Sequence, residues 1–208
     1  MTFTPIPSGT TTWDVPLNAA LTDLQDQITT LSAASGFAAT DHGLETWTHD
    51  PYGPQNTQIA TNGTAYFVRL NIRRTVTVDA IHWVVITGGA TPTAGQNEVA
   101  LYSSAGTRLA VTNVDASISS SGSKATAITA QALTAGSFVW VAFLFNAGTA
   151  PTLMRGSTFS TSPSVNLTVA TGRSVVNGTG LTALPASITP ASNSFTNNVT
   201  FWAALEAA

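Results

Sequence analysis

The sequence contains no cysteine, which excludes disulfides and metal sites built on thiolates. Basic residues are also scarce: lysine and arginine together number 7, Lys124 is the single lysine, and Arg73 and Arg74 are the only adjacent basic pair. Nucleic-acid binding depends on basic side chains clustered along one face, and this chain has a net charge of −3. We therefore expect no nucleic-acid partner.

Long hydrophobic runs are missing as well. The longest unbroken apolar run is FVWVAFLF, residues 138–145. A membrane-spanning helix needs roughly 20 such residues, so we expect no membrane insertion.

Charged residues make up only 8% of the chain, whereas hydrophobic residues make up 43%. The usual charged share is roughly 25%, about three times as large. Neutral polar residues and glycine must therefore cover most of the surface. Because charged groups are costly to bury, their scarcity leaves much of this surface available for contacts with neighbouring subunits.

Residues 1–13, MTFTPIPSGTTTW, combine two prolines with several threonines, a composition typical of an extended arm without a core of its own. Such an arm is ordered only if something ties it down. We expect it to dock onto another subunit, and packing against its own domain is the alternative.

Residues 14–36 carry the clearest local pattern, which predicts an oligomerising helix. Asp14 is a suitable N-cap, Pro16 falls in the first turn, and Gly36 can end the helix. Apolar residues follow the spacing 4, 3, 4, 3 of a coiled-coil seam: Leu17, Leu21, Leu24, Ile28 and Leu31. We expect this stripe to contact copies of the same chain, and an amphipathic helix lying on its own sheet is the alternative.

The leucine stripe also bears on the size of the oligomer. Leu21 and Ile28 occupy the a positions and leucine occupies every d position. The pattern of β-branched residues at a that favours dimers is therefore absent, and we expect a homotrimer.

Residues 37–59 are polar and interrupted by glycine and proline, which predicts a linker or a long ordered loop. This segment holds the only dense group of possible metal ligands: Asp41, His42, Glu45, His49 and Asp50. Histidine and carboxylate ligands suit zinc or a similar divalent ion, with His42 and His49 the candidates. Their spacing matches no established metal motif, so we interpret the segment as a solvated linker and expect no metal and no cofactor.

Strand patterns continue from about residue 60 to residue 208 and predict a mostly β fold, an antiparallel β-sandwich or jelly roll. Residues 66–73 alternate as a half-buried strand, and residues 99–111 read as a hairpin with its turn at 103–107. Residues 138–145 are apolar on both faces, as expected for a central strand. Further strands are predicted at 165–169, 173–176 and 199–205.

The sequence shows no frame for nucleophilic catalysis, because no Gly-x-Ser-x-Gly elbow occurs. Asp79, Glu98 and Asp115 lie near predicted strands, but their positions in the chain do not show whether two carboxylates converge as glycosidase chemistry requires. We expect no catalytic residues. Glycan binding is a separate hypothesis, because exposed aromatic rings in loops stack on sugars: Trp47, Tyr52 and Tyr102 are the candidates.

Four segments resemble small virion proteins of tailed phages that infect actinobacteria. They are TTWDVPLNAALTDLQDQI (11–28), VALYSSAGTRLA (99–110), LTAGSFVWVAFLFNAGTAPTLMRG (133–156) and, less specifically, LPASITP (184–190). The resemblance implies a capsid-decorating, head-fibre or minor tail protein: a trimer with an N-terminal attachment region and an outward β-sandwich head. It supplies no catalytic residue. The short heptad run differs from long tail fibres and favours a compact decoration or head-fibre protein.

Three functional hypotheses follow from the sequence. The first is a structural protein located in the virion, bound to other virion proteins through residues 1–36. The second is a minor tail or receptor-binding protein that recognises a host-surface glycan through loop aromatics of the same head. The third is a hydrolase of host envelope polysaccharide.

Overall fold

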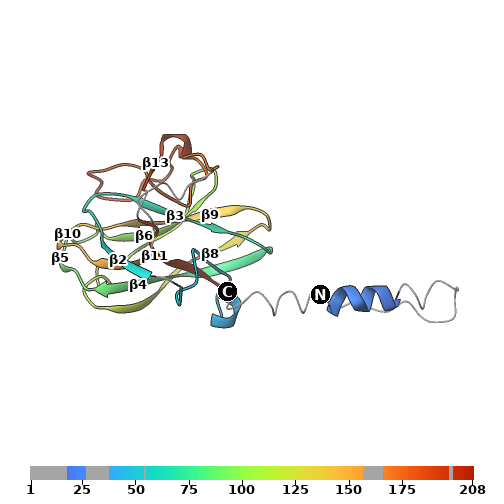
Figure 1. The fold of residues 1–208 in the computed structure, drawn as a ribbon. Coiled ribbons are helices and arrows are strands. Elements are labelled where there is room, and N and C mark those ends of the chain that lie inside the picture. The colour runs from blue at the N-terminus through green and yellow to red at the C-terminus, as the bar shows by residue number, and fades with distance from the viewer. Residues whose placement is uncertain (1–17, 27–37, 54, 157–165, 197–198) are drawn as a thin grey trace. The chain divides into compact units, whose positions relative to one another are not determined.

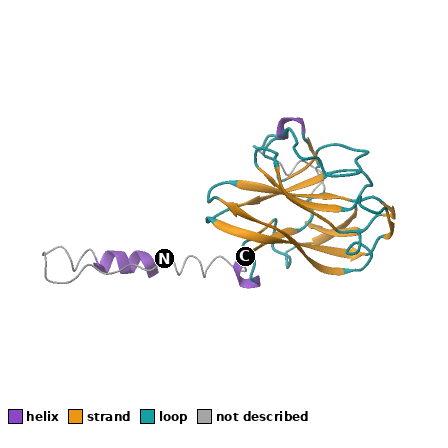
Figure 2. Ribbon diagram, turned by 180° about the vertical axis from the view of Figure 1, so that it is seen from behind, coloured by secondary structure: helices purple, strands orange, loops and turns teal. Residues whose placement is uncertain are grey.

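A computed structural model describes residues 18–26, 38–53, 55–156, 166–196 and 199–208. The chain divides into two compact units, residues 1–38 and residues 39–208. Each unit is described separately below. The larger unit consists almost entirely of strands and loops (Figures 1 and 2).

In the N-terminal unit, residues 18–26 are α-helical. The hydroxyl of Thr22 donates to the carbonyl of Asn18, one turn earlier, over 2.9 Å. Leu21 is half-buried and Leu24 is 48% exposed. Residues three apart lie on the same side of a helix, so these two leucines form one apolar face. Leu17, Ile28 and Leu31, like the arm at 1–13, lie outside the described residues.

The second unit contains two six-stranded antiparallel sheets, which we call sheet A and sheet B. Sheet A is built on the long strand β4, with β8 on one side and both β14 and β11 on the other. Its strands are β1 (Thr46–Trp47), β2 (Gln55–Ile59), β4 (Val76–Thr87), β8 (Gly122–Leu133), β11 (Thr152–Gly156) and β14 (Ala203–Ala207).

The segment 37–59, predicted as a linker or a long ordered loop, instead contributes two strands to sheet A, which corrects the domain boundary at residue 60. β1 pairs with β14, and β2 pairs with β11. The short helix η1 (Ala39–His42) precedes them, and Leu44 is buried just after it. The segment is polar because an edge strand needs few apolar side chains, so composition alone did not distinguish it from a linker.

Sheet B has the order β13-β12-β3-β9-β6-β7. Its strands are β3 (Tyr66–Asn71), β6 (Glu98–Ser103), β7 (Arg108–Asn113), β9 (Phe138–Leu144), β12 (Ser174–Val176) and β13 (Ser194–Phe195). The predicted hairpin at 99–111 is confirmed as β6 and β7. β9 lies between β3 and β6 and is buried on both faces, as its unbroken apolar sequence predicts. A separate pair, β5 (Ala90–Pro92) and β10 (Ala147–Thr149), completes the strands.

Sheets A and B face each other across one hydrophobic core. The core takes Ile81 and Trp83 from β4 and Val141 and Phe143 from β9. The opposite face of sheet B is covered by the chain between β12 and β13, including Leu184 and η2 (Pro190–Ser192), which Figure 1 shows above the sheet in orange and red. This covering segment explains why β9 has two buried faces in an antiparallel sheet.

Two of the late strand predictions need correction. Of the predicted strand 165–169, residue 165 lies outside the described residues and residues 166–169 form no strand. Asn166 has a left-handed backbone (φ 58°), and a turn follows in which the Thr171 N–H donates to the Thr168 carbonyl over 3.0 Å. The last strand, β14, begins at residue 203 and ends at residue 207, later than predicted at both ends.

Candidate functional site

Three aromatic side chains from the segment 39–53 come together at the edge of sheet A. The ring of His42, at the end of η1, lies 5.4 Å from the ring of Trp47 in an edge-to-face arrangement. The same imidazole lies 5.9 Å from the ring of Tyr52. We call His42, Trp47 and Tyr52 the aromatic cluster. Tyr52 is 80% exposed, so the cluster presents an aromatic surface to solvent.

The cluster rests on a small apolar core on the outer face of sheet A. Trp202 and Ala204 are buried there, and Trp47 packs against them. The indole N–H of Trp202 donates to the carbonyl of His49 over 3.0 Å. The backbone N–H of Tyr52 donates to the Asp50 carboxylate over 2.8 Å, which shapes the turn that carries the tyrosine. The positions of Trp47 and Tyr52 are therefore set by packing and hydrogen bonds.

Tyr102 does not belong to this surface, which corrects its assignment as a glycan-contact candidate. It lies within β6, is fully buried, and its hydroxyl donates to the Pro185 carbonyl over 2.5 Å. Burial raises the pKa of Tyr102 to about 12. Its role is to hold the covering segment onto sheet B. The sequence places this tyrosine near the end of a predicted hairpin strand. That position does not show whether the side chain is buried or exposed.

His49 immediately precedes the turn that carries Tyr52, and both of its ring nitrogens have partners. Nδ1 lies 3.1 Å from the Thr48 hydroxyl, and Nε2 lies 3.2 Å from the Gln55 side-chain oxygen. Burial lowers the pKa of His49 below its ordinary value, and the charge of Arg173 lowers it further, while Gln55 and Asp50 act in the opposite direction. The folded protein therefore favours the neutral form of this ring more than the unfolded chain does.

The lowered pKa of His49 predicts that stability falls in mildly acidic solution. An unfolded histidine has a pKa near 6.5. Below that pH the unfolded chain takes up a proton that the folded chain does not, so the free energy of unfolding decreases as the pH falls from about 7 towards 5. Urea unfolding across this range measures the slope. The variant His49→Gln should show a shallower slope, and an unchanged slope would contradict this account.

The described residues contain no group of three or more histidine, aspartate or glutamate side chains placed to hold a metal ion. His49 uses both ring nitrogens within the protein, and His42 packs against two aromatic rings. Glu45, another member of the predicted ligand group, forms an ion pair with Arg74 at 2.5 Å. The side chains of His42, His49 and Glu45 thus make contacts within the protein.

Two of the three carboxylates considered for hydrolysis hold backbone groups. Glu98 accepts the N–H of Leu184 over 2.6 Å, and Asp115 accepts the N–H of Gly95 over 2.7 Å. Partial burial by itself would raise the pKa of Asp115, but the hydrogen bonds from Gly95 and Asn97 outweigh it and lower the pKa. These contacts tie loops together.

Sequence reasoning missed two contributors to this region. His42 was considered only as a metal ligand, although its ring contacts both Trp47 and Tyr52. Arg173 donates to the carbonyl of Thr48 over 2.8 Å and so connects sheet B to the segment that carries the cluster. Thr48 and Arg173 are far apart in the sequence, and no local pattern relates them.

No known family model matches this chain, and a search of curated proteins found no match. Within the part of the chain that the structure describes, no helix combines the length and apolar character needed to cross a membrane.

Proposed function

We propose that this protein is a non-enzymatic structural component of a phage virion, a homotrimer joined and attached through residues 1–36. In this proposal the rest of the chain is an outward β-sandwich head on the capsid, as a decoration or head-fibre protein. The sequence resemblance to small virion proteins motivates the assignment. The scarcity of charge supports it, because uncharged surface is less costly to cover with neighbouring subunits.

The observation that carries the proposal is the leucine pair on the N-terminal helix. Leu24 is 48% exposed in the single chain, and Leu21 is half-buried on the same side. Exposing such a face to water is unfavourable, and burying one leucine side chain stabilises by about 1.5–3 kcal/mol. Matching faces of neighbouring copies would remove both leucines from water at once.

We predict that the full chain is a trimer and that the chain without residues 1–36 is a monomer. Light scattering measures both masses. In the full chain, Leu21→Asp combined with Leu24→Asp should also give a monomer, because it places charges in the contact. The matched control is Ala19→Asp with Thr22→Asp, which adds the same charge on the far side of the helix and should remain a trimer.

A monomeric full chain at high concentration would contradict the proposed assembly. The location on the particle has its own test. Imaging of virions with a label fused to the C-terminus should place the label at regular positions on the capsid, and absence of the label from purified virions would rule out a virion role.

A second candidate function is recognition of a host-surface glycan by the aromatic cluster, as in a minor tail or receptor-binding protein. The specific observation in its favour is the exposure of Tyr52 beside His42 and Trp47. Rings presented in this way stack on the apolar faces of sugars.

We predict that Tyr52→Ala and Trp47→Ala each weaken binding to a positive member of a glycan array about tenfold, which corresponds to roughly 1.4 kcal/mol. The matched control is Ile59→Ala, which removes an exposed apolar side chain (57% exposed) elsewhere on the same sheet edge. Binding that survives both aromatic substitutions, or no binding by the unaltered trimer, would contradict this function.

A further inference from the structure

Two arginines lie directly opposite each other in sheet B: Arg69 within β3, and Arg173 immediately before β12. β3 and β12 pair with Val68 opposite Ser174, and the ladder continues one position further, where the N–H of Arg69 donates to the carbonyl of Arg173 over 3.0 Å. Residues directly opposite in an antiparallel pair place their side chains on the same face, about 5 Å apart at Cβ. The two side chains therefore leave the backbone side by side, and their charges are close enough to influence each other.

Each of these guanidinium groups is held in place by neutral partners. Arg69 donates to the Asn71 side chain over 3.0 Å and to the Thr171 carbonyl over 2.8 Å, and its guanidinium lies 4.1 Å from the ring centre of Phe138. Arg173 donates to the Thr48 carbonyl over 2.8 Å. A guanidinium carries five N–H donors. Several donors of each therefore remain available to a ligand.

Among the described residues, this pair has no acidic partner within ion-pair distance. The ion pairs in the described part of the chain join Arg74 to Glu45 and His82 to Glu206, and neither involves Arg69 or Arg173. Like charges directly opposite each other on a sheet are destabilising. Burial, followed by the charge of Arg173, lowers the pKa of Arg69, so the two groups act on each other. An arrangement that costs stability and fixes both groups is typical of a binding site.

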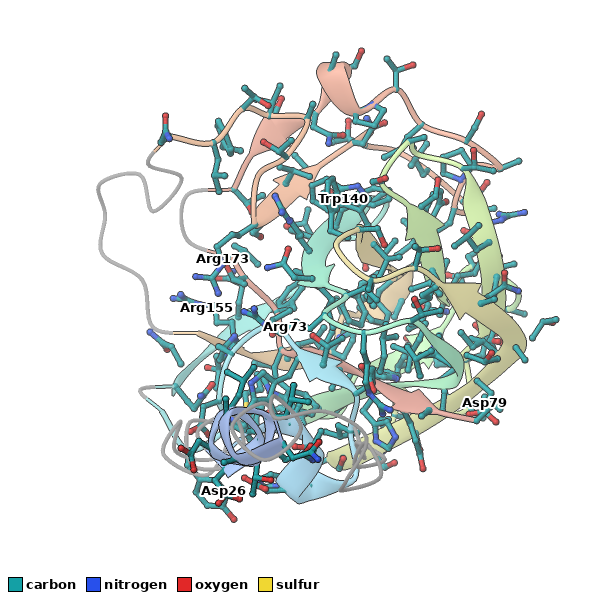
Figure 3. All side chains as sticks on the ribbon, turned by 90° about the vertical axis from the view of Figure 1, so that its right-hand side faces the viewer. Asp26, Arg73, Asp79, Trp140, Arg155 and Arg173 are labelled. Carbon is teal, nitrogen blue, oxygen red and sulfur yellow. The ribbon has the colours of Figure 1, made fainter. Side chains whose placement is uncertain are left out.

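The row of side chains continues with another donor that lacks an acceptor. Trp140 lies opposite Arg69 on β9 and is fully buried. Among the described residues, its indole N–H is the buried side-chain polar group without a hydrogen-bond partner. In Figure 3, Arg173 lies at the margin of the β unit and Trp140 lies deeper within it. The row thus places two arginines next to a buried N–H group that has no acceptor among the described residues.

From this arrangement we infer that Arg69 and Arg173 form a binding site for an oxyanion, a phosphate or carboxylate group. The planar fork of a guanidinium matches both groups with paired, charge-assisted hydrogen bonds. An oxyanion between the two guanidinium groups would also cancel their repulsion. The inference does not depend on the proposed place of the protein in a virion or on glycan stacking at the aromatic cluster.

The first test uses the full chain with inorganic phosphate as the probe. At low ionic strength, phosphate should raise Tm more than chloride does at equal ionic strength. Arg173→Gln should weaken phosphate binding at least tenfold compared with the unaltered chain, because it removes one of the two guanidinium groups. Arg69→Gln should weaken phosphate binding in the same way and serves as the second variant.

Arg73→Gln is the matched control, because Arg73 is an exposed arginine outside the row and its removal changes the net charge equally. It should bind phosphate like the unaltered chain. Calorimetry with poly(glycerol phosphate) and with oligogalacturonate then separates the two sources, since binding of the first identifies a phosphate ligand and binding of the second a carboxylate ligand. No preference for phosphate over chloride, or equal phosphate binding by Arg173→Gln and Arg73→Gln, would overturn the inference.

Discussion

Replacing Phe143 with alanine is expected to lower the free energy of unfolding by about 3–5 kcal/mol. Phe143 is fully buried at the centre of the core between sheets A and B. Its ring lies 5.8 Å from the ring of Phe201, 6.1 Å from that of Trp83 and 6.2 Å from that of Phe145. Alanine would remove these contacts and leave a cavity that the rigid sheets cannot close.

Urea or guanidinium unfolding of the full chain measures how much Phe143→Ala lowers the free energy of unfolding. Ile59→Ala serves as the control, because Ile59 is exposed and its truncation should change stability by no more than about 0.5 kcal/mol. Equal losses for the two variants would mean that the space between the sheets is not closely packed.

Replacing Asn97 with alanine is expected to cost about 2–3 kcal/mol, through hydrogen bonds and not through lost apolar contact. Asn97 is fully buried. Its side-chain oxygen accepts the N–H of Asn146 over 2.8 Å, and its amide donates to the Thr93 carbonyl over 3.0 Å and to the Asp115 carboxylate over 2.8 Å. Alanine would leave these partly buried groups without partners, and three loops would lose their common connection.

Asn56→Ala is the matched control for Asn97→Ala, since it removes the same atoms from an exposed position on β2. Thermal unfolding should show a clear loss for Asn97→Ala and little change for Asn56→Ala. Hydrogen exchange adds a local readout, because the Asn146 N–H should lose protection in the Asn97 variant. Retained protection at Asn146 would contradict the role given to this side chain.

The strongest strand predictions succeeded where the pattern in the sequence is local. Residues 138–145 are apolar without interruption, and they form the central strand β9. The hairpin at 99–111 has its glycine at position 106 in the turn, with a φ of 90° that favours glycine. Both features depend on neighbours within a few positions, so they could be identified without knowledge of the fold.

The prediction of a linker or long ordered loop at 37–59 was wrong because the pairing of this segment depends on residues far away in the chain. Its strands β1 and β2 exist because the edges of β14 and β11 offer unpaired backbone groups, and these strands lie about 100 or more positions later in the chain. A polar, glycine-containing segment can pair with the N–H and C=O groups of such an edge through its own backbone alone. Composition therefore could not distinguish it from a loop.

In the candidate sites, too, the sequence predicted some residues and could not predict others. The sequence identified Trp47 and Tyr52 as aromatics near predicted loops but could not show that His42 joins them or that Tyr102 is buried. Nothing local marks Arg69 and Arg173 as a pair. Their contact arises from the register between β3 and β12, which a shift of one residue would abolish.

Local patterns were sufficient to predict that this chain is mostly β, that it lacks thiol chemistry, and that its N-terminal segment includes an amphipathic helix, because period, composition and residue type act locally. Only the folded arrangement shows which surfaces exist: that β1 and β2 complete sheet A, that Tyr52 is exposed beside His42 and Trp47, and that two arginines lie opposite each other. Strand pairing between distant segments has no local signature, because backbone hydrogen bonds are the same for every residue except proline.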